Sequence, residues 1–141
     1  MYFITDQNFG NKVILEPRIP NNYFTRNNIE DNHTPRICCA DTIDGALVGL
    51  AKNISGQILY VYQPVGNFQV TIPTNDQVPG ASKYREYWIT SKTEFEYVKT
   101  ILVGAPRDEL IPYEYYMNKK AYIAYMYHWN WIELERTVVN D

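Results

Sequence analysis

The sequence predicts an α+β fold in which a strongly bent or split antiparallel β-sheet carries one or two helices. Two observations lead to this class. Short apolar or alternating segments bounded by Gly, Pro and Asn follow one another along most of the chain, as is typical of antiparallel strands. Between two of these segments, residues 41–51 combine a capping residue with one apolar stripe at helical spacing. The length of 141 residues favours a single domain, 1–141.

The N-terminal part predicts two short strands followed by a long loop. Tyr2 to Thr5 and Lys12 to Leu15 are extended segments separated by a turn rich in Asn and Gly, and they could form two edges of a sheet. Residues 16–35 contain Pro17, Pro20, Pro35 and several asparagines, with no helical or strand period. Loops longer than about a dozen residues are uncommon in compact domains and are often binding or lid segments. A mobile surface segment is the alternative.

The central part predicts a strand, a helix and a second strand. Residues 36–40 are the first strand, and Asp41 or Thr42 can cap the helix because each offers a side-chain oxygen to free backbone N–H groups. The apolar stripe of the helix consists of Ile43, Ala46, Leu47, Leu50 and Ala51. Residues 53–56 end the helix, and residues 58–63 form an apolar strand bounded by Pro64.

The C-terminal half predicts further strands and a less regular segment. Residues 68–72 alternate, with Phe68, Val70 and Ile72 inward. Two more strands are expected at 84–90 and 95–103, and the sequence Gly-Ala-Pro-Arg-Asp at 104–108 indicates a break. For residues 110–126 we slightly favour a helix over an extended aromatic strap. A closing strand is expected at 129–136.

Composition and charge narrow the classes of function. The net charge is −3, with 13 basic and 16 acidic residues, so the excess of Lys and Arg that binds nucleic acid irrespective of sequence is absent. The sequence also has no run of acidic residues, which disfavours a protein that mimics DNA. The 13 tyrosines indicate contact surfaces in addition to a core, because a ring with a hydroxyl tip can remain half exposed.

The two cysteines, Cys38 and Cys39, are adjacent and point to opposite faces of a strand, which disfavours a disulfide between them. We expect them to be small buried apolar residues in a reducing compartment. His33 and His128 are the only histidines, so no metal site is predicted. No signal peptide or membrane span is recognisable, and we expect a cytoplasmic protein.

Three short motifs follow one another in the central part. They are Thr42-Ile43-Asp44-Gly45-Ala46, Leu59-Tyr60-Val61-Tyr62-Gln63-Pro64-Val65-Gly66 and Val78-Pro79-Gly80. Their order and spacing resemble those of the small bacterial rifampin ADP-ribosyltransferases, which belong to the diphtheria-toxin-type ADP-ribosyltransferase superfamily. The resemblance covers residues 1 to about 103. It implies an ADP-ribosyltransferase-like fold and a cleft for NAD or an NAD-derived nucleotide.

The catalytic residues that the resemblance implies are missing. Phe3 stands where the family has a His that holds the nicotinamide ribose, and Cys38 stands where it has a Tyr on the nicotinamide ring. Residues 67–71 bring no carboxylate where the family has its functional acid. Removing one electrostatic partner of a transition state typically costs roughly 3–4 kcal/mol. We therefore expect a degenerate active site that needs no cofactor.

Glu86 is the one acid that could restore catalysis, because it lies near the place where other branches of the superfamily have a catalytic Glu. The alternative, which we favour, is a solvent-facing strand residue paired with Arg85 or Lys83. Arginines can hold phosphates through two parallel hydrogen bonds, or they can simply cap carbonyls beside the prolines. The predicted ligand-binding residues are Arg18, Asn22, Arg36, Tyr62 and Trp88.

The Tyr/Trp-rich segment 110–136 would suit a protein interface, because rigid amphipathic rings are enriched at binding hot spots. The predicted interface residues are Tyr115, Tyr116, Tyr125, Trp129 and Trp131. Core or lid is the alternative for this segment. His128 is expected to pack among its aromatic neighbours rather than to act as a base.

Three functions remain open from the sequence. The first is a non-catalytic binding protein that sequesters a nucleotide or inhibits a host protein, which would suit a phage or mobile-element anti-defence protein such as an anti-CRISPR or an anti-signalling protein. The second is an active mono-ADP-ribosyltransferase or NAD glycohydrolase that uses Glu86. The third is a structural module in which the tyrosines connect the subunits of a homo-oligomer.

Overall fold

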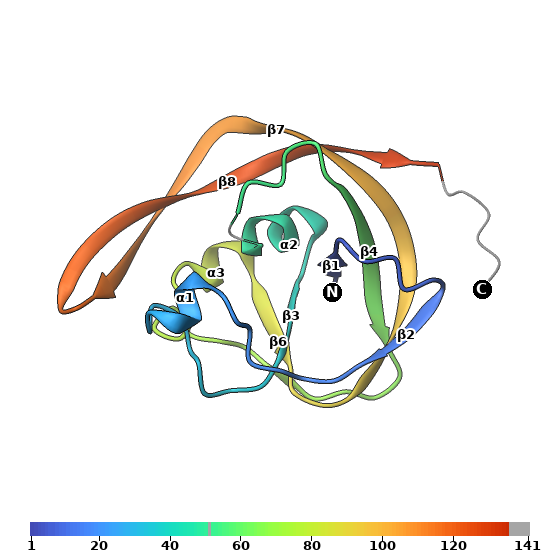
Figure 1. Ribbon diagram of the computed structural model, residues 1–141, viewed down its shortest axis with the longest axis horizontal. Helices are drawn as coiled ribbons and strands as arrows, with labels where there is room; N and C mark the ends of the chain where they lie inside the picture. Colours follow the sequence, from blue (N-terminus) through green and yellow to red (C-terminus); the bar gives the residue numbers. More distant parts are fainter. Residues whose placement is uncertain (51, 136–141) are drawn as a thin grey trace.

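The computed structural model describes residues 1–50 and 52–135 and has an α+β fold with two antiparallel sheets (Figure 1). The first sheet has the order β1-β4-β7-β2, with β8 also paired to β7, and the second has the order β3-β6-β5. The strands are β1 Phe3–Thr5, β2 Lys12–Leu15, β3 Ile37–Ala40, β4 Ile58–Val65, β5 Val70–Thr71, β6 Glu86–Ile89, β7 Thr93–Met117 and β8 Lys120–Leu134; the helices are α1 Tyr23–Arg26, α2 Ile43–Gly49 and α3 Ala81–Tyr84. The predicted class is confirmed, with three short helices among the described residues where one or two were expected.

The long strand β7 organises the first sheet. One of its edges pairs with β4, from Glu94 to Leu102. The opposite edge pairs first with β2 and then, from Thr100 to Met117, with β8. The expected break at 104–108 is a pair of register shifts inside the β7–β8 ladder, so the strand continues through it. As predicted, β1 and β2 lie at edges of the sheet.

The preferred helix at residues 110–126 is wrong. These residues form the two arms of a β-hairpin, which turns at Asn118 and Lys119 with φ values of 52° and 63°. The segment is rich in Tyr and Ile, which favour strands, and the rings of the cross-strand pair Tyr115 and Tyr122 stack on each other. Beyond the end of its pairing with β4, the β7–β8 ribbon arches over the helices and projects from the body (Figure 1).

The second sheet separates two apolar clusters. Cys38 pairs with Trp88 in register and packs with it in one cluster, whereas Cys39 packs in the other with Ile37 and Ile89. This arrangement confirms that the adjacent cysteines point to opposite faces. β5 comprises only two residues and both are exposed, so the expected inward alternation of Val70 and Ile72 is wrong.

Helix α2 is anchored at its first turn and along its apolar stripe. Thr42 is the N-cap, and its Oγ1 accepts a hydrogen bond of 2.9 Å from the backbone N–H of Gly45. Leu47 is fully buried and packs against core residues of the first sheet, namely Ile4, Leu59, Val61 and Ile101. At Gly45 the helix also approaches α3 closely, because a Cβ atom there would lie 2.4 Å from the carbonyl oxygen of Tyr84.

We predict that Gly45→Ala destabilises the protein, although Ala is favoured over Gly in helices by about 1 kcal/mol. The added methyl group would collide with a backbone oxygen, which cannot rotate away as a side chain could. Urea denaturation should show a lower midpoint for this variant. Gly104→Ala is the matched control, because the nearest atom to its Cβ would be 3.5 Å away. Unchanged or increased stability of Gly45→Ala would contradict the close approach.

Candidate functional site

Arg36, Glu86 and Trp88 form a buried polar cluster on one face of the second sheet. The guanidinium carbon of Arg36 lies 4.2 Å from the centre of the Trp88 ring, which is a cation–π geometry. The indole Nε1 of Trp88 donates a hydrogen bond of 2.8 Å to Glu86 Oε2. Alternation along β6 places Glu86 and Trp88 on the same face, so the sequence places two of the predicted site residues together.

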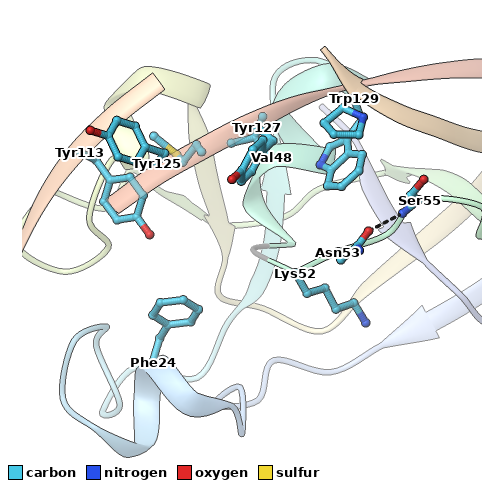
Figure 2. Close-up of a pocket in the computed structure, with 11 residues that line it drawn as sticks. Phe24, Val48, Lys52, Asn53, Ser55, Tyr113, Tyr125, Tyr127 and Trp129 are labelled. Atoms are coloured by element: carbon cyan, nitrogen blue, oxygen red, sulfur yellow. Dashed lines mark hydrogen bonds between the residues drawn. The ribbon is translucent and has the colours of Figure 1, made fainter. Parts of the chain in front are cut away.

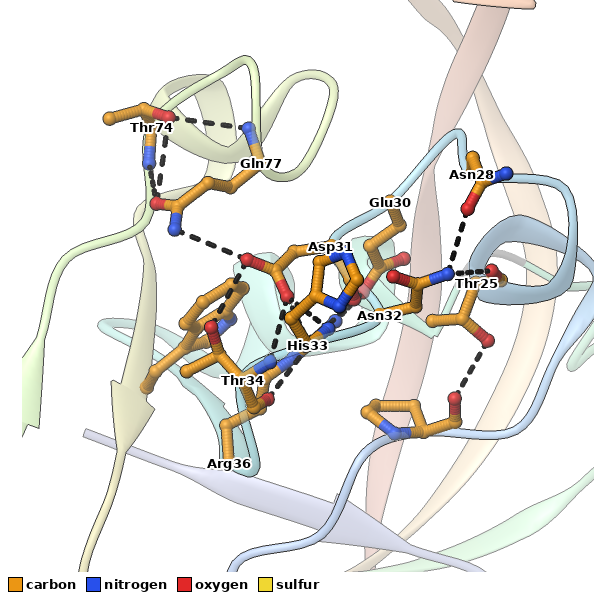
Figure 3. Close-up of polar contacts among 12 residues, drawn as sticks. Thr25, Asn28, Glu30, Asp31, Asn32, His33, Thr34, Arg36, Thr74 and Gln77 are labelled. Atoms are coloured by element: carbon orange, nitrogen blue, oxygen red, sulfur yellow. Dashed lines mark hydrogen bonds and ion pairs between the residues drawn. The ribbon is translucent and has the colours of Figure 1, made fainter.

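The side chain of Arg36 is completely buried and holds the preceding loop (Figure 3). Its NH1 group donates to the carbonyl oxygens of Asp31 at 2.7 Å and Thr34 at 3.0 Å. Its NH2 group binds the carboxylate of Glu30 at 2.8 Å. Asp31 also accepts from the backbone N–H groups of His33 and Thr34, so the loop 30–34 is tied to one cation.

Glu86 is 6% exposed, so the favoured expectation of a solvent-facing residue is wrong. Of its expected partners, Arg85 lies 3.3 Å from Asp41, and Lys83 donates to the carbonyl of Pro112. The second carboxylate oxygen of Glu86 accepts from the hydroxyl of Tyr84 at 3.4 Å. Burial raises the pKa of Glu86 to about 7, and the hydrogen bond from Trp88 opposes the shift.

We predict that Glu86 makes folding stability fall as the pH rises. Its pKa is about 7 in the folded protein against an ordinary value of 4.5, so the folded state binds more protons between these values. The contribution of Glu86 is therefore complete below pH 4.5 and is lost as the pH passes 7. Urea denaturation at a series of pH values should show this slope in the wild type and a flatter profile in Glu86→Gln. Exposed Glu94→Gln should keep the slope, and an identical slope in Glu86→Gln would contradict the assignment.

An aromatic cleft of about 540 Å³ lies between the β7–β8 ribbon and the helices (Figure 2). We call it the aromatic cleft. It is lined by Phe24, Val48, Lys52, Asn53, Ser55, Pro106, Tyr113, Tyr125, Met126, Tyr127 and Trp129. Its volume lies within the range of roughly 300–1,000 Å³ that is usual for small-molecule sites. The cleft therefore has room for a ligand of nucleotide size.

The two ends of the aromatic cleft differ in chemistry. Tyr113 and Tyr125 lie at one end, with the ring of Phe24 reaching towards them from α1 (Figure 2). Lys52, Asn53 and Ser55 follow helix α2 and lie together at the other end. The cleft can therefore stack a planar ring at its aromatic end and meet an anionic group at its polar end.

The polar cluster supports two walls of the aromatic cleft. Val48 and Met126 line the cleft and pack in the same apolar cluster as Trp88. The loop that Arg36 holds begins at Glu30, whose backbone N–H donates to the carbonyl of Phe24 at 3.1 Å. Arg36 and Glu86 themselves do not line the cleft. Their contribution is to position the groups that do.

The other predicted ligand-binding residues lie elsewhere. Arg18 is exposed, and its backbone pairs with that of Arg36 in an isolated bridge. Asn22 caps α1, accepting a hydrogen bond of 3.1 Å from the backbone N–H of Thr25. Tyr62 is fully buried, and its hydroxyl accepts from Phe9 N at 2.8 Å and donates to a carbonyl of the same turn. None of the three lines the aromatic cleft.

The predicted interface residues divide into two groups. Tyr125 and Trp129 line the aromatic cleft, while Tyr115 belongs to the ribbon, where it stacks on Tyr122 with ring centres 5.5 Å apart. Tyr116 is also on the ribbon and is 66% exposed. Trp131 donates from Nε1 to Asp44 at 2.9 Å, which attaches the ribbon to α2.

Sequence reasoning missed most of the residues that line the cleft. Phe24 lies in the segment predicted as a loop, Lys52 follows the helix, and Tyr127 lies between the segment interpreted as helical and the expected closing strand. The density of tyrosines was the only signal, and it indicated a contact surface without its location. The hairpin is what brings these three segments together.

Phe3 and Cys38, the two positions at which the sequence resemblance led us to expect a His and a Tyr, are packing residues. Phe3 packs on Phe95 with ring centres 5.5 Å apart, and Cys38 packs with Trp88 in a different cluster. Burial raises the pKa of the Cys38 thiol well above its ordinary range, so the thiol remains protonated. In the described part of the chain, no three metal-ligating side chains gather into a site.

Comparison of the chain with protein-family models, with curated proteins and with solved structures finds no match. Among residues 1–50 and 52–135, no helix has the length and apolar character needed to cross a bilayer.

Proposed function

We propose that this protein is a non-catalytic binding protein that sequesters a nucleotide in the aromatic cleft. The observation that carries the proposal is the polarity of the cleft, which joins an end with the rings of Phe24, Tyr113 and Tyr125 to an end that carries Lys52. A nucleotide has the same two parts, a planar base and an anionic phosphate. The resemblance to rifampin ADP-ribosyltransferases supports an NAD-derived nucleotide as the ligand class.

The aromatic end of the cleft suits a nucleobase. Tyr125 and Tyr127 are 52% and 45% exposed, so their rings are accessible without moving the core. Stacking of one base on an aromatic side chain contributes roughly 1–3 kcal/mol. The phosphate would meet Lys52, a flexible cation that binds phosphate as a point charge.

The position of Glu86 supports binding without turnover. Glycosidic cleavage of NAD needs a carboxylate that counters positive charge on the ribose, and that carboxylate must reach the ligand. Both oxygens of Glu86 are engaged by Trp88 and Tyr84, and the side chain does not line the cleft. No acid occurs among the described residues that line the cleft.

We predict that NAD, ADP-ribose or a cyclic dinucleotide raises the stability of the protein with no release of nicotinamide. A ligand at a hundredfold excess over its Kd should add about 2.7 kcal/mol to the free energy of unfolding. Tyr127→Ala should weaken binding about tenfold, which corresponds to roughly 1.4 kcal/mol of lost stacking. Lys52→Ala should reduce the salt dependence of binding. Thermal denaturation and titration calorimetry measure these effects.

Two controls define the site. Tyr116→Ala removes an exposed tyrosine of the ribbon outside the cleft, and Arg18→Ala removes an exposed arginine that the sequence predicted to bind the ligand; both variants should bind as the wild type does. Loss of binding in Arg18→Ala alone would indicate that the ligand binds near Arg18 and not in the aromatic cleft. Nicotinamide release that Glu86→Gln abolishes would favour the enzyme. No stabilisation by any of the nucleotides would overturn the proposal and favour a protein partner.

A further inference from the structure

The outer edge of β8 is the longest free strand edge in the described part of the chain. β8 has 15 residues, or about 50 Å at roughly 3.3 Å per residue, and it pairs with β7 alone. Its residues make no backbone hydrogen bond with any other described segment. A free edge presents a row of N–H and C=O groups that can pair with another strand.

The other edges are short or covered, except the edge of β7 beyond Leu102, which faces away from β8 and contains Pro106 and Pro112. β1, β2 and β5 have 3, 4 and 2 residues. The outer side of β3 is bridged by Tyr2 and, just before the strand, by Arg18. Short edge strands are one of the ways in which proteins prevent unwanted pairing. β8 differs from β1, β2 and β5 in its length, and from the free edge of β7 in containing no Pro.

β8 also lacks the residues that protect an edge. Between Ala121 and Ile132 it contains no Pro, Lys, Arg, Asp or Glu. Large apolar side chains project from it into solvent instead, since Ile123 and Ile132 are 69% and 60% exposed. An isolated two-stranded ribbon of this kind is marginally stable in water, so a third strand would stabilise it.

The charges at the two ends of β8 favour a second copy of β8, in antiparallel orientation, as the partner strand. Lys119 and Lys120 stand at its start, and Glu133 is the only acidic residue within it. A second β8 in parallel orientation would place like charges side by side. In antiparallel orientation it would place the lysines of each chain beside the glutamate of the other, so the strand is electrostatically complementary to itself.

We propose that two copies of this chain join by antiparallel pairing of their β8 edges and form one continuous sheet. The two strands are related by a two-fold axis perpendicular to the sheet, so the residue at the axis lies opposite the same residue of the second copy. A residue before it then pairs with the residue equally far after it in the second copy, and both side chains point to the same face of the sheet. With the axis at Met126, Tyr125 faces Tyr127 of the second copy, and Lys119, in the turn that precedes β8, comes next to Glu133 of the second copy. The projecting end of each ribbon then lies along the attached end of the other. The pairing is isologous and uses both free edges, so assembly stops at a dimer.

Analytical ultracentrifugation over a range of protein concentrations tests this proposal. The wild type should reach twice its mass of 16.5 kDa. Ile123→Lys places a charge on the edge and should weaken the dimer at least tenfold, whereas Ile72→Lys is the matched control because both isoleucines are 69% exposed. Ile123 does not line the aromatic cleft, so the monomeric variant should still bind nucleotide if the proposed function holds.

Charge reversal gives an independent readout. Lys119→Glu should weaken the dimer by facing Glu133 with a second acid, and the double variant Lys119→Glu/Glu133→Lys should restore it, although Lys99 loses its ion pair with Glu133. Near-ultraviolet circular dichroism confirms that each variant is folded. A wild type that remains monomeric at every concentration overturns the proposal. A dimer that is equally strong in Ile123→Lys and Ile72→Lys, or assembly that continues beyond two copies, overturns it as well.

Discussion

The buried guanidinium of Arg36 is the interaction on which the candidate site depends. It joins the loop 30–34 to the ring of Trp88, and through the hydrogen bond from Glu30 to Phe24 it fixes one wall of the aromatic cleft. Breaking a buried ion pair by removing one partner typically costs about 3–5 kcal/mol, because the other charge is left without compensation. The ion pair with Glu30 and two carbonyl contacts make this burial possible.

The second constraint is the length of β7. β7 pairs with β4 along one edge and with β2 and β8 along the other. The first sheet and the ribbon therefore form a continuous surface. The ribbon lies over α2 and is attached to it by the hydrogen bond from Trp131 to Asp44. This attachment makes the aromatic cleft a space between elements far apart in the sequence, with Phe24, Lys52 and Tyr127 contributed by three different segments.

Glu86 shows how a carboxyl group can be accommodated in a buried position. Its burial between Tyr84 and Trp88 favours the neutral form, and its oxygens satisfy two buried donors. Burial also raises the pKa of Tyr84, so the phenol keeps its proton and remains a donor. The face of β6 that carries Trp88 is covered by Tyr84 and Val48, and this packing helps to position the wall of the cleft that Val48 and Met126 form.

The sequence by itself determined the elements whose signals are local. Short extended or apolar segments bounded by turn residues indicated β1, β2, β3 and the core of β4. A capping threonine and one apolar stripe indicated α2, and adjacency on a strand separated Cys38 from Cys39. Only the tertiary structure decided the state of residues 110–126, the burial of Glu86 and the location of the cleft, because each depends on pairing or packing between distant segments. Local preference alone does not decide whether a Tyr-rich segment is helical or extended. The partner strand β7 decides between them by supplying the hydrogen bonds of a ladder.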